Sequence, residues 1–171
     1  MAKRIARFEK VSFEQFMEGF LDCFGEASLE EVKEIYRKVK LPARATAGSA
    51  GYDFFAPVDL ELAPGETVKL PTGIRVWMEP DWVLSCYPRS GLGFKYRLQL
   101  NNTVGIIDSD YYYSDNEGHI FAKVTNDTKD GRTVAVGAGC GFMQGIFTEY
   151  GITLDDHVEE VRNGGFGSTT K

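Results

Sequence analysis

A series of short apolar runs separated by turn residues fills this chain from about residue 35 onward and constrains its fold more than any other feature. Turn signals rich in Gly, Pro, Asp and Asn recur at 63–66, 71–73, 79–81, 115–118 and 130–131. Runs of strand length lie between or beside them, at 83–87, 104–107, 120–124 and 133–136. Strands at this spacing predict an all-β barrel or sandwich.

The first 34 residues follow a different pattern. Residues 4–9 alternate like a strand, and Ser12-Phe13-Glu14-Gln15 is a capping-box pattern. Apolar residues then recur at helical spacing up to Gly25, a residue typical of a helix end: Phe13, Phe16, Met17, Phe20, Leu21 and Phe24. Ser28 predicts the start of a second, shorter helix. Because the polar face of the first helix is acidic, we expect it to pack on this protein or a subunit neighbour rather than on a membrane.

Composition narrows the class of protein. The chain has 171 residues, enough for one domain with a small appendage, and no apolar run approaches the ~20 residues of a membrane span. No apolar secretory segment follows the basic N-terminus, so a cytoplasmic location is predicted. Three scattered cysteines predict structural thiols in a reducing compartment. A formal net charge of −6 argues against a nucleic-acid partner, so an anionic ligand would need a local cluster of cations and backbone amides.

The most informative stretch runs from Asn101 to Tyr111. It begins with two amides, continues through a β-branched segment and ends in Asp108-Ser109-Asp110-Tyr111. A strand of this kind holds its backbone rigid and presents polar side chains at its end, where small-molecule chemistry is usually done. Ordinary turn chemistry would also account for Asp-Ser-Asp, because short polar side chains bond their own backbone.

Four further segments could face an anionic ligand. The arginine fork, serine hydroxyl and backbone amides of Pro88-Arg89-Ser90-Gly91-Leu92-Gly93 match phosphate geometry. The others are Ala50-Gly51-Tyr52-Asp53, the stretch from Gly139 to Gln144, and Arg162 with the glycine-rich residues 164–169. Taken singly, each is also explained by a loop, a bulged strand or a structural turn.

The order of these five segments resembles the five motifs of the trimeric deoxyuridine triphosphatases (dUTPases). The resemblance covers the chain from about residue 40 to its C-terminus. It implies a distorted, jelly-roll-like β-barrel of the β-clip type over residues 35–160, after a strand and helical extension over 1–34. Residues 161–171 would be a flexible glycine-rich tail that closes on the active site. The subunits would form a homotrimer with shared active sites.

The resemblance also implies the reaction, which is hydrolysis of dUTP to dUMP and pyrophosphate. Asp108 would hold and deprotonate the attacking water. Mg²⁺ would bind mainly through the substrate phosphates, with no direct protein ligand and with Asp53 reaching it, if at all, through water. The remaining substrate-binding residues divide by role. Arg89, Ser90, Gln144 and Arg162 would contact phosphates, Asn102 and Gly105 the base, Tyr111 the sugar, and Phe166 would stack on the base, with Gly91, Ile107, Gly167 and Ser168 also in contact.

The chain departs from the family pattern in three places. Tyr112–Glu117 delay the glycine that usually follows the motif tyrosine, which predicts a longer hairpin at the rim of the site. Gly141 stands where a basic residue is usual, and the fifth motif is one residue shorter than its commonest form.

Two alternatives stay open. The dCTP deaminases share the barrel, although they would need a glutamate at position 108 and typically Arg-Ser-Ser at 89–91. The second alternative is a regulatory protein that binds a protein partner through residues 10–36.

Overall fold

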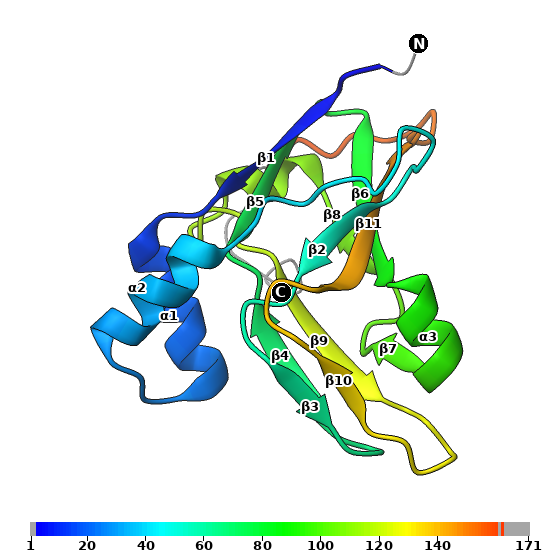
Figure 1. Ribbon diagram of the computed structural model, residues 1–171. Helices are drawn as coiled ribbons and strands as arrows, with labels where there is room; N and C mark the ends of the chain where they lie inside the picture. The colour runs from blue at the N-terminus through cyan, green and yellow to red at the C-terminus, as the bar shows by residue number, and fades with distance from the viewer. Residues whose placement is uncertain (1–2, 161, 163–171) are drawn as a thin grey trace.

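The computed structural model describes residues 3–160 and 162 of the chain. Within these residues the strands pair antiparallel into four small sheets, shown in Figure 1. The largest of these sheets has the order β2 (Tyr52–Phe55), β11 (Gly141–Glu149), β6 (Trp82–Pro88) and β8 (Gly105–Ile107). The second has the order β4 (Thr67–Pro71), β9 (Phe121–Asn126) and β7 (Leu98–Leu100). Two strand pairs complete the set, β1 (Ala6–Lys10) with β5 (Ile74–Met78) and β3 (Leu60–Leu62) with β10 (Val134–Val136).

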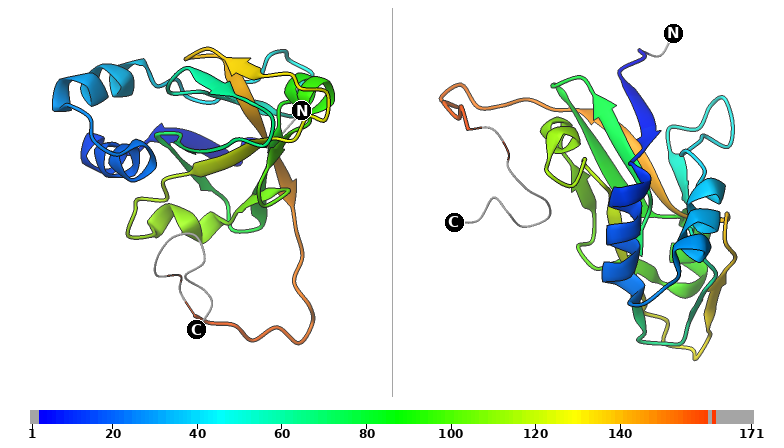
Figure 2. Two further views of the ribbon diagram at one scale, coloured as in Figure 1. Left: turned by 90° about the horizontal axis from the view of Figure 1, so that it is seen from below. Right: turned by 90° about the vertical axis from the view of Figure 1, so that its left-hand side faces the viewer.

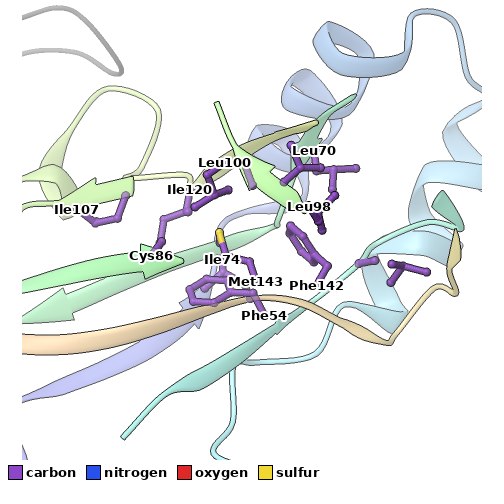
Figure 3. Close-up of a cluster of buried hydrophobic side chains, with 14 of the residues drawn as sticks. Phe54, Leu70, Ile74, Cys86, Leu98, Leu100, Ile107, Ile120, Phe142 and Met143 are labelled. Carbon is purple, nitrogen blue, oxygen red and sulfur yellow. The ribbon is translucent and has the colours of Figure 1, made fainter. Parts of the chain in front are cut away.

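One hydrophobic core receives side chains from all four sheets. β3, β7, β8 and β10 each read buried–exposed–buried, which is the alternation of a strand with one face in the core. Figure 3 shows Phe54, Phe142 and Met143 packed among the aliphatic side chains of this core. Each of the four apolar runs forms a strand, although in three of them the strand begins one residue later than the run, so the predicted all-β class is confirmed.

Both helices expected in the N-terminal segment are present. α1 spans Phe13–Phe24, and its first turn is capped by Ser12, whose Oγ accepts a hydrogen bond from the Gln15 amide at 3.1 Å. α1 ends at Gly25, which has a positive φ of 79°. α2 spans Leu29–Lys38, so the strand-like pattern begins later than residue 35. Ile35 belongs to the helix because its side chain packs against the apolar cluster of the helix pair.

This segment packs onto its own chain. Val11, Phe16, Phe20 and Val32 form a second buried cluster between the helices, and α1 lies against β4. The helix pair sits together on one side of the sheets in Figure 2. Close approach requires Gly19, because a Cβ at that position would lie 2.8 Å from Cε1 of His119. The expectation that α1 packs on the protein itself is confirmed, and no described helix is long and apolar enough to cross a membrane.

A third helix and an arm complete the chain. α3 spans Ser90–Tyr96 and begins two residues after β6 ends at Pro88. Beyond β11, residues 150–160 are exposed and lead away from the sheets in both views of Figure 2. Cys23, Cys86 and Cys140 are free thiols, and burial raises the pKa of Cys86 to about 12.

His119 is fully buried where α1 meets the sheets. Its Nε2 accepts a hydrogen bond from the Gly73 amide at 3.0 Å, so the proton of the neutral ring is on Nδ1. That nitrogen faces Gly19 and has no hydrogen-bond partner among the described residues. Burial lowers the pKa of His119 to about 4, against a smaller opposing effect of the Glu117 carboxylate.

This burial predicts a loss of stability in mild acid. The unfolded chain binds a proton at residue 119 below about pH 6.5, whereas the folded chain resists protonation down to about pH 4. The free energy of unfolding should therefore fall as the pH drops through this window, by up to about 3 kcal/mol. Urea denaturation at pH 7, 6 and 5 measures it. His119→Gln keeps an acceptor for Gly73 and should flatten the dependence, whereas exposed His157→Gln should not; equal slopes in all three proteins would contradict the assignment.

Candidate functional site

A cavity of about 670 Å³ opens where two consecutive strands part. β7 pairs with β9, whereas β8 pairs with β6, so the chain crosses from one sheet to another between Leu100 and Gly105. Asn102, Gly105 and Ile107 line the cavity, and α1 closes one side of it through Gln15, Glu18, Gly19 and Asp22. Three residues with a predicted substrate-binding role therefore share one cavity, and the wall from α1 was not foreseen from the sequence.

Glycine is favoured at position 105 of this wall because β8 and β6 approach each other closely there. A Cβ at Gly105 would lie 3.2 Å from Cβ of Cys86, the residue opposite it in β6. That contact is tighter than carbon atoms normally make, and neither strand can yield without disturbing the sheet. The Cβ added at Gly105 would also lie 3.7 Å from Nδ2 of Asn102. Glycine therefore lets the side-chain amide of Asn102 lie close to the β8 backbone at the cavity wall.

Asp108 lies at the end of β8 and immediately before the 3₁₀ helix Ser109–Tyr113. Its carboxylate accepts a hydrogen bond from Nη2 of Arg162 at 2.5 Å, and Asp110 accepts one from Nε of the same guanidinium at 2.9 Å. Both carboxylates are about half exposed, at 48%, whereas the Arg162 side chain is only 18% exposed. Arg162 was expected on phosphates; here it bridges the two carboxylates that flank Ser109.

Tyr111 is buried beneath this pair. Its hydroxyl donates to the His119 carbonyl at 2.7 Å and accepts from the Asn116 side-chain amide at 2.9 Å. Burial raises the pKa of Tyr111, with smaller opposing effects from Asn116 and Arg162. The phenol therefore stays protonated, and two hydrogen bonds fix the position of its hydroxyl.

A second group of predicted residues gathers at the other end of β6. The Arg89 guanidinium lies 3.4 Å from the Asp53 carboxylate, and both side chains face Gly141. A basic side chain at Gly141 would meet the Arg89 charge, which accounts for the glycine at this position. Gln144 lies opposite Asp53 in β11 and donates a 3.4 Å hydrogen bond to the Pro88 carbonyl. Ser90 and Gly91 begin α3 beside them and are exposed.

The two groups lie far apart within one chain. Ile107 is opposite Leu84 in the β6–β8 ladder, so Asp108 follows at the level of Val83. Arg89 comes after the other end of β6, six residues further on, which is about 20 Å of strand at ~3.3 Å per residue. One subunit therefore does not bring Asp108 together with Arg89, Ser90 and Gln144.

The side chains of the two groups have the chemistry needed to bind an anion and to accept a proton. Arg89 and Arg162 supply charge, the start of α3 supplies backbone amides, and Asp108 supplies a half-exposed carboxylate. Within residues 3–160 and 162, no group of three or more His, Cys, Asp or Glu side chains could hold a metal ion. Phe166, Gly167 and Ser168 lie outside the described residues.

Comparison with known proteins identifies this arrangement. The family model described as dUTPase matches residues 37–170. The chain belongs to the dUTPase family. The described strands and their order thus represent the dUTPase type of fold, as the five motifs implied.

Several relatives are similar over most of their length. The deoxyuridine 5'-triphosphate nucleotidohydrolase of Lactococcus lactis is 41% identical over 134 residues, 77% of this chain and 88% of that protein. The crystal structure of the dUTPase from Streptococcus mutans is 33% identical, with a TM-score of 0.61, over 85% of this chain and 97% of that one. A mutant of the dUTPase from phage phi11 of S. aureus, described with a structural Mg(II) ion, shares the fold at 20% identity and a TM-score of 0.57, over 72% and 92% of the two chains.

Gly91 and Gly105, two of the glycines assigned to substrate binding, should differ sharply in the substitutions they tolerate. Gly105→Ala should lower the free energy of unfolding by about 1–3 kcal/mol, because its methyl group presses on Cys86. Gly91→Ala is the matched control, since nothing lies within 4 Å of the added carbon and the position is helical. Urea denaturation of both variants measures the difference; equal stability would show that the β6–β8 contact yields freely.

Proposed function

We propose that this chain hydrolyses dUTP to dUMP and pyrophosphate, in active sites that more than one copy of the chain completes. The observation that carries the proposal is the β8 segment, which lines the cavity with Asn102, Gly105 and Ile107 and leads directly into Asp108. A base held in the cavity would leave its sugar over Tyr111 and its α-phosphate near the carboxylate.

Asp108 acts as the general base. A water molecule held by its carboxylate attacks the α-phosphorus and gives up a proton to Asp108. The bond from phosphorus to the bridging oxygen then breaks, and pyrophosphate leaves. Orientation and proton acceptance by a carboxylate contribute a rate factor of about 10²–10⁴.

Arg162 is positioned to make this step depend on substrate. Its guanidinium rests on Asp108 and Asp110, and a triphosphate offers it more negative charge than two half-exposed carboxylates do. Moving to the phosphates would free Asp108 to hold the water. Arg89 would leave Asp53 for the phosphates in the same way.

The residues present also suit Mg²⁺ carried by the substrate. Mg²⁺ prefers oxygen ligands and keeps several waters, so it is held through phosphates and one or two carboxylates rather than by a protein cage. Asp53, 17% exposed and close to Arg89, is placed to reach such an ion through water. When bound, the ion neutralises charge on the triphosphate.

Selectivity follows from the cavity. Uracil presents a carbonyl where cytosine presents an amino group, so polar groups arranged for uracil are left unpaired by cytosine, a discrimination of about 10⁴ or more. A panel of dUTP, dTTP, UTP and dCTP, with and without Mg²⁺, tests the proposal. Pyrophosphate release from dUTP alone supports it, whereas ammonia release from dCTP would replace it with the deaminase alternative.

Asp108→Asn should separate binding from chemistry. The amide keeps the size of the side chain but accepts no proton, so kcat for dUTP should fall at least ~100-fold while KM changes little. Asp110→Asn is the matched control, because Asp110 has the same exposure and shares Arg162. Asp110→Asn should lower kcat for dUTP much less than Asp108→Asn does. Equal losses in the two variants would remove Asp108 from the role of base.

Assembly into a homotrimer would complete the sites. About 20 Å of β6 separates Asp108 from Arg89 in one chain, so a second copy must supply one of the two. The chain also exposes apolar side chains on α3 and the C-terminal arm, namely Phe94, Ile152, Leu154 and Val158. Such side chains mark surfaces that other chains cover. A further protein partner for the N-terminal segment stays a prediction.

Mixing two inactive variants tests this sharing. Co-expressed Asp108→Asn and Arg89→Ala chains should regain activity at about a quarter of the sites in an equal mixture, because these sites take each residue from an intact copy. Mixing Asp108→Asn with the double variant is the control and should stay inactive. An inactive first mixture of normally assembled trimers would place Asp108 and Arg89 of each site on one chain.

A further inference from the structure

The turn that follows Tyr111 has an unusual backbone. Glu117 adopts φ +57°, in the left-handed region, and Gly118 follows at φ +71°. A Cβ at Gly118 would lie 2.7 Å from the Tyr111 carbonyl oxygen, so only glycine fits there. For Glu117 this conformation is strained, because its Cβ crowds the backbone, and other contacts must offset the strain.

Those contacts come from the start of α1. The Glu117 carboxylate accepts hydrogen bonds from the Ser12 amide at 2.7 Å and from the Ser12 hydroxyl at 2.6 Å. A negative charge at a helix N-terminus is favourable, because the first amides of the helix lack partners. Burial opposes the ionisation of Glu117, but the bonds from Ser12 outweigh it and the pKa lies below its ordinary value.

A second tie joins the same two segments. The Tyr112 hydroxyl donates to Glu9 of β1 at 2.7 Å. Arg75, opposite Glu9 in β5, stacks on the Tyr112 ring at 3.7 Å and donates to the Tyr112 carbonyl at 2.9 Å. Arg75 also approaches Glu117 at 4.0 Å. The N-terminal segment and the turn are thus joined by two contacts, Ser12 with Glu117 and Glu9 with Tyr112, and Arg75 lies close to both Tyr112 and Glu117.

The same turn also contacts Tyr111, through Asn116. Asn116 lies next to Glu117, lines the cavity and donates to the Tyr111 hydroxyl at 2.9 Å. Its Oδ1 accepts from the Gly118 amide at 3.2 Å, which fixes the orientation of the side-chain amide. A continuous path of contacts therefore runs from Ser12 through Glu117 and Asn116 to Tyr111.

We propose that Glu117 is a positioning residue which, held by Ser12, keeps Asn116 on Tyr111, so that the N-terminal segment sets the selectivity of the site for deoxyribose over ribose. The inference rests on the proposed function, in which Tyr111 packs under the sugar. Loosening the turn lets the Tyr111 ring move and makes room for a 2′-hydroxyl. Sugar selectivity thereby depends on a contact between residues 105 positions apart.

The test is the ratio of kcat/KM for dUTP to that for UTP. Glu117→Ala should lower this ratio about fivefold to tenfold, the effect of losing one hydrogen bond, while kcat for dUTP stays close to that of the wild type. Glu117→Gln retains an acceptor for the Ser12 amide and should restore most of the selectivity. Ser12→Ala should have a smaller effect, and adding it to Glu117→Ala should change the ratio little further, because both act through one contact.

Controls separate positioning from general damage. Glu66→Ala also removes a turn carboxylate that accepts a backbone amide, but, unlike Glu117, Glu66 has no neighbour in the chain that lines the cavity, so the ratio should not change. If Glu117→Ala does not fold, Asn116→Asp removes the donor to Tyr111 with almost no change of shape and should lower the ratio alone. A wild-type ratio in Glu117→Ala or in Asn116→Asp would overturn the inference while leaving dUTP hydrolysis intact. A wild-type chain that does not cleave dUTP would instead overturn the proposed function.

Discussion

The division of two consecutive strands between two sheets is the constraint on which the site depends. β7 is hydrogen-bonded to β9 and β8 to β6, so the backbone between them cannot close into a hairpin. The space that results is the cavity, and several of the side chains that line it, among them Cys86, Ile107 and Met143, belong to the hydrophobic core itself. A rigid backbone is what recognition of a small flat base requires, because donors and acceptors must keep their places without the ligand.

β6 links this cavity to Arg89 and Gln144, the residues expected to bind phosphates. It is paired on both sides, with β8 near Asp108 and with β11 near Gln144, and its last residue leads into Arg89. A strand held on both edges behaves as a fixed spacer. It separates Asp108 from Arg89 by about 20 Å within one subunit, which is why we propose that copies of the chain share their active sites.

The arginines of the site form ion pairs that can exchange one anionic partner for another. The chain carries a net charge of −6, yet the site needs to attract a polyanion. Arg89 and Arg162 each rest on carboxylates that are partly open to water, where ion pairs are weak. Such pairs keep the cations in place, and in the proposed function phosphate oxygens replace the carboxylates. Glu117 differs, because its partners are the part-buried amide and hydroxyl of Ser12, the N-cap of α1, and it stabilises the fold rather than exchanging partners.

Local signals in the sequence determined many of the strands and both N-terminal helices, because alternation, capping residues and turn glycines act over a few residues. The five segments expected to carry chemistry were found through a resemblance in their order along the chain, not through any one local signal. Ser12 shows where such signals stop. The capping box correctly predicted its bond with the Gln15 amide, but the Ser12 amide is satisfied by Glu117, which comes 105 residues later. The α1 wall of the cavity, the path to Tyr111 and the separation of Asp108 from Arg89 likewise depend on which strands pair. Only the tertiary structure decided them, because contacts between distant segments leave no local pattern in the sequence.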